Sequence, residues 1–494
     1  MLAVAVLGSG MVFLDSTVVN VALPVIGHDL HASASSLQWI LNGYLLSLAS
    51  LILLGGALGD RYGRRRVFAI GAALFTGASL LCAVAPTVET LIVARLLQGV
   101  AGALLTPGSL AMIESSFRQP DRPRAIGAWS GLTGVAAAIG PLLGGYLVGA
   151  VSWRAVFFIN LPLGIFVVLS ARRVPESRDP TATGHLDIRG AALAALGLAG
   201  TTYALIEAPG HGSSVLTWAA GIGGVIALIL FVMQERSSPE PMLPLGLFAN
   251  RQFSAANVVT FVVYAALGGV FFLLVAFLQI SMGYSPIAAG AASLPITVLM
   301  LLFSARSGAL AQRIGPRIPL TLGPVIVAAG LLLMTQINPG DTYMASVFPA
   351  VVVFGVGLTL VVSPVTATVL AAADERHSGI ASGVNNAVAR VAGLLAVAVL
   401  PLVAGLTGER FYNPATMTHG FHVAMIVSAA VAASGGVIAW LTISNDVLAA
   451  GPESRGEEPV EVSTDFSCAV SGPPLRQIEH GSPAAAGVLS KRAS

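Results

Sequence analysis

The sequence predicts an all-α protein that crosses a membrane fourteen times. Of its 494 residues, 55% are hydrophobic and 10% are charged, whereas a soluble domain carries roughly 25% charged residues to keep its surface hydrated. Each crossing takes about 20 apolar residues, so fourteen crossings would occupy a little over half the chain, close to the hydrophobic fraction. The mean hydropathy of +0.84 agrees. This composition excludes a soluble enzyme, a nucleic-acid-binding protein and a disordered scaffold.

Apolar runs separated by charged and Gly/Pro-rich segments mark the predicted spans. They cover residues 2–23, 37–58, 67–85, 89–114, 125–149, 154–171, 188–206, 215–234, 253–279, 287–305, 318–336, 343–370, 378–404 and 420–442. No basic segment precedes the first run, which also contains Asp15. We therefore interpret it as the first span rather than as a signal peptide.

The basic residues predict an even number of spans. With the N-terminus in the cytoplasm, 21 of the 25 Lys and Arg residues fall in the cytoplasmic loops and the C-terminal tail, and Arg154 and Arg410 fall in the outer loops. Cytoplasmic loops of membrane proteins carry such an excess. Because one missed helix would reverse every later loop, the bias predicts a multi-pass protein of the cell membrane with both termini cytoplasmic.

An internal repeat divides the chain. The segment GALGDRYGRR at 56–65 recurs at 308–317 as GALAQRIGPR, with six of ten positions identical. Spans 1–6 then correspond to spans 9–14, and spans 7 and 8 are inserted. We expect a six-helix bundle over 1–175, two inserted helices with linkers over 176–240, a second six-helix bundle over 241–443 and a disordered cytoplasmic tail over 444–494. Parallel six-helix repeats with a site between them are a transporter architecture.

Six motifs in order resemble the 14-span drug:proton antiporter branch of the Major Facilitator Superfamily. They are Leu14–Pro24, Gly56–Arg66, Arg95–Gly99, Ala136–Gly145, Trp153–Pro162 and Ser378–Asn386. The resemblance implies alternating access and the export of small lipophilic compounds, such as drugs or antibiotics, without a cofactor beyond the proton gradient. Two departures stand out: Gln312 replaces Asp60 in the second repeat, and the tenth span has no acidic residue. The second departure makes divalent cationic substrates less expected.

Three ionisable side chains, Asp15, Arg95 and Arg390, lie well inside predicted spans, where a charge is costly and usually functional. At 1.5 Å per residue, Asp15 is about 20 Å into span 1 and Arg95 about 9 Å into span 4 from the opposite side, so the two reach similar depth. The resemblance implies that these spans line one cavity. We predict that Asp15 is the proton-coupling acid and that Arg95 tunes its proton affinity. A static ion pair is the alternative.

Two further motifs have a plain and a functional interpretation. The resemblance implies that Asp60, with Arg61, Gly63 and Arg64, forms a cytoplasmic gate by docking on the helix that begins near Ser378. The plain interpretation is that the arginines only anchor the topology. Gly140, Pro141, Gly144 and Gly145 would form a kinked, tightly packed hinge that seals against proton leak, as the resemblance implies, or only a site of close helix packing.

Seven residues are candidates for a substrate cavity: Tyr44, Gln98, Tyr264, Phe271, Gln279, Asn385 and Arg390. Their aromatic rings and amides also serve helix packing. Arg390 either faces the cavity or bonds backbone carbonyls. The histidines lie in loops, the tail or span ends, and no phosphate-binding Lys-Ser/Thr follows the Gly-rich stretches. We therefore expect that the protein binds no metal and no cofactor and is not an enzyme.

The partners expected from the sequence are a small lipophilic substrate, protons and the lipid bilayer, with the protein acting as a monomer. Two alternatives remain open. One is a narrow-specificity metabolite exporter or permease of the same fold, and the other is a membrane sensor that does not transport.

Overall fold

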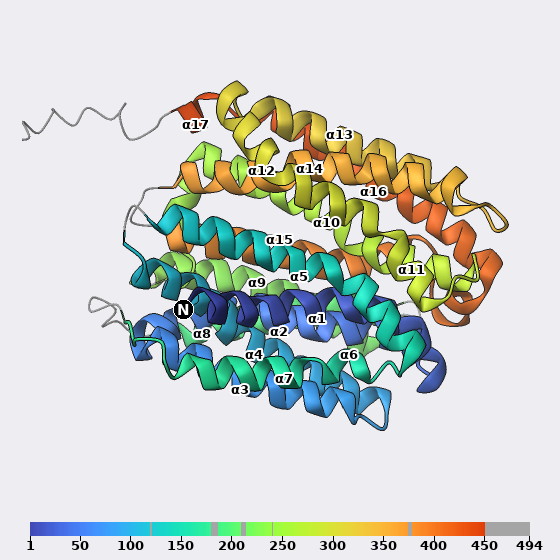
Figure 1. The fold of residues 1–494 in the computed structure, drawn as a ribbon, viewed down its shortest axis with the longest axis horizontal. Helices are drawn as coiled ribbons and strands as arrows, with labels where there is room; N and C mark the ends of the chain where they lie inside the picture. Colours follow the sequence, from blue (N-terminus) through green and yellow to red (C-terminus); the bar gives the residue numbers. More distant parts are fainter. Residues whose placement is uncertain (119–120, 179–185, 209–213, 240, 374–377, 450–494) are drawn as a thin grey trace, which may run out of the picture. The chain divides into compact units, whose positions relative to one another are not determined.

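The computed structural model describes residues 1–118, 121–178, 186–208, 214–239, 241–373 and 378–449, and these residues contain helices and no β-strand (Figure 1). The first half contains α1 (Leu2–Asp29), α2 (Ala34–Tyr62), α3 (Arg64–Ala83), α4 (Val88–Ser116), α5 (Arg122–Ala150), α6 (Ala155–Phe158) and α7 (Asn160–Ala171). Then follow α8 (Ile188–Glu207), α9 (Val215–Ser237) and the 3-10 turn η2 (Leu245–Ala249). The second half contains α10 (Arg251–Ile280), α11 (Pro286–Ala292), α12 (Leu294–Ile314), α13 (Arg317–Met334), η3 (Tyr343–Val347), α14 (Phe348–Ala371), α15 (Ser378–Val403), η5 (Gly408–Tyr412), α16 (Pro414–Thr442) and α17 (Asp446–Ala449).

The predicted all-α membrane architecture is confirmed. In the part of the chain that the structure describes, thirteen helices are long and apolar enough to cross a membrane, and Ala155–Ala171 is a shorter apolar segment at the predicted sixth span. α1 packs on α5, and α4 packs on α2 and α3. In the second half, α13 packs on α14 and α16, and α10 packs on α15 and α16. α8 and α9 pack mainly on each other, and α8 also contacts α2 and α15.

Capping side chains set where several helices begin. Thr87 forms a capping box at the start of α4, and the Asn250 side chain accepts hydrogen bonds from two backbone N–H groups at the start of α10. Asn413 does the same for α16 and is followed by Pro414 in the first turn. These side chains satisfy backbone donors that the helix cannot. α16 therefore begins at residue 414, six residues before the predicted start at 420.

Prolines interrupt two predicted spans. The sixth is divided at Ile159 into α6 and α7, and the tenth is divided at Ser293 into α11 and α12. Pro162 and Pro295 follow these breaks within the first turn of the next helix. A proline has no N–H to donate to the carbonyl four residues earlier and clashes with it. The helix consequently restarts at these points. By contrast, α1 continues through Pro24 to Asp29, beyond the predicted end at residue 23.

The predicted disordered tail begins too early. The Ser444 N–H donates to Gln252 Oε1 over 3.0 Å, and the Asn445 side-chain oxygen accepts from the Arg317 N–H over 3.2 Å. These contacts hold the chain on the second half as far as the short helix α17. Residues 450–494 of the predicted tail lie outside the described residues.

Candidate functional site

A buried ion pair joins α1 and α4 in the first half. The Arg95 Nη1 group donates to Asp15 Oδ2, and both side chains are completely buried. The Arg95 guanidinium also donates through Nε to the Ile40 carbonyl oxygen over 3.1 Å. Its carbon lies 4.3 Å from the centre of the Tyr44 ring on α2. The two residues predicted to reach the same depth are thus in direct contact.

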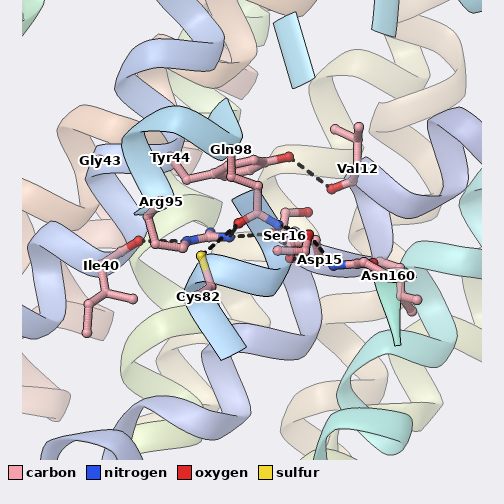
Figure 2. Close-up of polar contacts among 12 residues, drawn as sticks. Val12, Asp15, Ser16, Ile40, Gly43, Tyr44, Cys82, Arg95, Gln98 and Asn160 are labelled. Carbon is pink, nitrogen blue, oxygen red and sulfur yellow. Dashed lines mark hydrogen bonds and ion pairs between the residues drawn. The ribbon is translucent and has the colours of Figure 1, made fainter. Parts of the chain in front are cut away.

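Two amides complete the shell around the carboxylate of Asp15 (Figure 2). Gln98 Nε2 donates to Asp15 Oδ1 over 2.8 Å, and Asn160 Nδ2 donates to the same oxygen over 3.0 Å. Both amides also donate to the Ser79 hydroxyl, and Gln98 Oε1 accepts from Arg95 over 2.6 Å. A buried charge is tolerated only when it is paired and hydrogen-bonded, and this network meets that requirement with side chains from α1, α3, α4 and α7.

Two atoms of the network have no partner among the described residues. Arg95 Nη2 and Asn160 Oδ1 are buried without a hydrogen bond. An unmade bond of a buried polar group costs free energy, so the arrangement is not at its most stable.

Asn160 and Ser79 were not among the predicted site residues. Asn160 lies within the motif Trp153–Pro162, and membership of that motif is the sequence signal that could have identified it. Ser79 lies in an apolar helix with no sequence signal. Tyr44 and Gln98 were predicted to line a substrate cavity, but they are 1% and 0% exposed and belong to the ion-pair network.

The predicted cytoplasmic gate is held within the first half. Asp60, near the end of α2, accepts from Nε of Arg64, the first residue of α3, over 2.7 Å. Gly63 has φ +108°, and a Cβ added there would lie 2.8 Å from the Glu176 carboxyl group. Glu176 also accepts from the backbone N–H of Arg65 over 3.0 Å. Arg61 lies over the ring of Tyr62. Docking of Asp60 on α15 stays a prediction, and residues 374–377, just before that helix, lie outside the described ones.

The predicted hinge packs α5 against two helices. A Cβ at Gly140 would lie 1.9 Å from Thr17 Oγ1, and one at Gly144 would lie 2.8 Å from the Val18 carbonyl oxygen, both on α1. On the other side, a Cβ at Gly145 would lie 2.5 Å from the Pro286 carbonyl oxygen of α11. Only glycine allows such close backbone approach. The motif therefore joins α1 to α5 and α5 to the second half.

The remaining cavity candidates are dispersed. Gln279 Nε2 donates to the Val21 carbonyl oxygen over 3.0 Å and so joins the two halves. Asn385 accepts from the Thr260 hydroxyl over 2.8 Å, and Phe271 packs edge-on against Phe354. Tyr264 and Arg390 are within electrostatic range of each other. Arg390 donates to Asn386 and not to a backbone carbonyl among the described residues.

Comparison with known proteins gives a consistent result. The sequence profile described as "Major Facilitator Superfamily" matches residues 5–397. The chain is 34% identical to the puromycin resistance protein pur8 of Streptomyces alboniger, covering 89% of this chain and 90% of that protein. It is 35% identical to a methylenomycin A resistance protein of Bacillus subtilis, covering 90% and 94%. It is 36% identical to the tetracenomycin C resistance and export protein of Streptomyces glaucescens, covering 83% and 77%.

Solved structures support the fold alone. A POT family transporter superposes with a TM-score of 0.66 at 14% identity, covering 88% of this chain and 94% of that chain. A D-xylose-proton symporter superposes with a TM-score of 0.60 at 14% identity, covering 90% and 97%.

Proposed function

Because the chain belongs to the Major Facilitator Superfamily, we propose that it is a proton-coupled antiporter that exports small lipophilic compounds from the cell by alternating access. The observation that carries the proposal is the completely buried pair of Asp15 and Arg95. In this proposal the protein works as a monomer in the cell membrane, with both termini cytoplasmic, and needs no cofactor beyond the proton gradient.

Asp15 is the proposed proton carrier. Burial of a carboxyl group favours its neutral form, whereas a neighbouring arginine favours the charged form. In the conformation described here Arg95, Gln98 and Asn160 all donate to the carboxylate of Asp15. A conformation that hydrates the carboxyl group and moves Arg95 away would allow proton uptake. A proton that enters down a potential of 100 mV supplies about 2.3 kcal/mol.

The proposed gates lie at opposite ends of the helices. With cytoplasmic termini, the outer ends of the two halves are joined by the bonds from Gln279 to Val21 and from Tyr412 to Ala32. Toward the cytoplasm α5 is less covered, since a Cβ at Gly127, Gly131 or Gly134 would meet no atom within 4 Å, whereas the glycines of the hinge motif are all closely packed. We propose that the outer end is closed in this conformation and that Asp60 acts in the gate at the cytoplasmic end.

The proposed substrates are drugs or antibiotics. Three similar proteins carry names that refer to resistance to puromycin, methylenomycin A and tetracenomycin C. By similarity to them, we expect this chain to lower the concentration of such compounds in the cell that makes it.

A drug-susceptible bacterial host tests the proposal. Expression of the chain should raise the inhibitory concentration of several lipophilic antibiotics, and an uncoupler should abolish the efflux measured directly with labelled compounds. Asp15→Asn should lose this efflux at equal membrane abundance. Asp341→Asn, in an exposed loop, is the matched control. Export of a single metabolite in a broad panel would favour a narrow-specificity exporter, and binding without flux would contradict transport.

A further inference from the structure

Arg390 is a cation in the middle of α15. It lies 12 residues after Ser378 and 13 residues before Val403, the two ends of the helix. At 1.5 Å per residue, each end is about 18–20 Å away along the axis. An arginine near a membrane surface extends its charged group toward water, but from this position neither surface is within reach of the side chain. The charge of Arg390 therefore stays inside the protein.

The guanidinium of Arg390 is only partly used by the protein. Nε donates to Asn386 Oδ1 on the same helix over 2.7 Å. The guanidinium carbon lies 5.7 Å from the centre of the Phe13 ring on α1. The two terminal amino groups donate to no atom of the described residues, and neither is fully buried. They are therefore not used by the protein's own described atoms and remain available to a ligand that reaches Arg390.

The surroundings of Arg390 leave its charge without a counter-ion. Within the described part of the chain, no carboxylate forms an ion pair with it, whereas Arg95 has Asp15. The titratable groups in electrostatic range of Arg390 are the phenols of Tyr44 and Tyr264. An unpaired cation at membrane depth is costly and marks a functional position. Aromatic rings around it add apolar surface.

We propose that Arg390 anchors the anionic group of the transported compound. The expected substrates are lipophilic aromatic molecules that carry a carboxylate or a sulfonate. The two open amino groups of the guanidinium match two oxygens of such a group, and the rings of Phe13 and Tyr264 offer faces for an aromatic system. Phe13 belongs to the first half and Arg390 to the second, so a bound molecule touches both. This assignment rests on the proposed export function.

A pair of dyes that differ only in one charged group tests the assignment. 8-Anilinonaphthalene-1-sulfonate is anionic, and N-phenyl-1-naphthylamine is its uncharged analogue. Binding is measured by equilibrium dialysis with the full-length protein in nanodiscs of neutral lipid, with empty nanodiscs subtracted. The wild type should bind the sulfonate more tightly than the neutral dye. Arg390→Gln should weaken sulfonate binding at least tenfold and change binding of the neutral dye less than threefold.

Two variants provide the controls. Arg390→Lys keeps the charge and should retain part of the preference for the sulfonate. Arg306→Gln removes one positive charge from an exposed site on α12, where Arg306 donates to the Leu302 carbonyl oxygen, and should leave both affinities unchanged. Size-exclusion profiles and thermal unfolding establish that each variant is folded.

The outcomes separate this assignment from the export function. Equal weakening for both dyes, unchanged sulfonate binding in Arg390→Gln, or no preference in the wild type overturns the assignment. A proton leak in Arg390→Gln with unchanged dye affinity would make the residue an electrostatic barrier and also overturns it. If the wild type holds the sulfonate through Arg390 and an imposed proton gradient drives no movement in proteoliposomes, the export function fails and the anchor stands.

Discussion

Gly290 of α11 touches Pro141 of α5 so closely that a Cβ added to Gly290 would lie 2.1 Å from the Pro141 carbonyl oxygen. The contact joins the two halves of the protein at the end where α1 also bonds α10. A backbone oxygen cannot turn aside as a flexible side chain can, so any side chain at position 290 forces the two helices apart.

Gly290→Ala should therefore open the outer contact between the halves. We expect a faster passive proton leak in proteoliposomes, followed with a pH-sensitive dye, and at least a severalfold loss of export. Gly134→Ala on α5 is the control, because a Cβ there meets no atom within 4 Å. An unchanged leak in Gly290→Ala would show that this contact does not seal the outer end.

The pair of Asp15 and Arg95 predicts a non-additive pattern of stability. Removing one partner of a buried ion pair typically costs about 3–5 kcal/mol, because the other charge is left unpaired. Asp15→Asn and Arg95→Gln should each lower the unfolding temperature in detergent. The double variant should unfold at a higher temperature than either single variant and still lack proton-driven export. Additive losses of stability would mean that the two charges do not interact.

Substitution of Asp60 distinguishes a role of its motif in gating from a role in anchoring the topology. Asp60 pairs with Arg64 across the break between α2 and α3, and its side chain is 39% exposed. A surface pair of this kind contributes about 0–1 kcal/mol to stability. We expect Asp60→Ala to fold normally and lose at least tenfold in transport rate, whereas Asp60→Glu keeps most activity. Full activity in Asp60→Ala, measured at equal membrane abundance, would leave the motif only an anchoring role.

Tyr412 holds η5 against the end of α1. Its hydroxyl donates to the Ala32 carbonyl oxygen over 2.6 Å, and burial raises the pKa of Tyr412 to about 12, so the phenol remains a donor at neutral pH. Tyr412→Phe removes this bond, which is worth about 1 kcal/mol. Hydrogen exchange in residues 26–32 and 406–414 should become about fivefold faster, with unchanged exchange in α13 as the internal reference. If residues 26–32 exchange at the same rate in Tyr412→Phe as in the wild type, the bond has no role in closing the outer end.

The sequence was sufficient for the all-α class, the positions of the spans and the family. The length of each apolar run indicates which segment crosses the bilayer. Prolines and capping residues determine where individual helices begin, as in α7 and α16. Depth along a helix follows from counting residues, which is why Asp15 and Arg95 were expected at one level.

Which side chains meet at that level was decided by tertiary structure. Asn160 and Ser79 complete the shell of Asp15 from α7 and α3, and the buried side chains of Tyr44 and Gln98 contact the same ion pair. The contacts depend on how each helix is rotated about its axis and how closely its neighbours approach. In a chain that is apolar on nearly every helix face, hydropathy does not encode that rotation. The composition showed that charge is scarce, and packing determined that Arg95 has a counter-ion and Arg390 has none among the described residues.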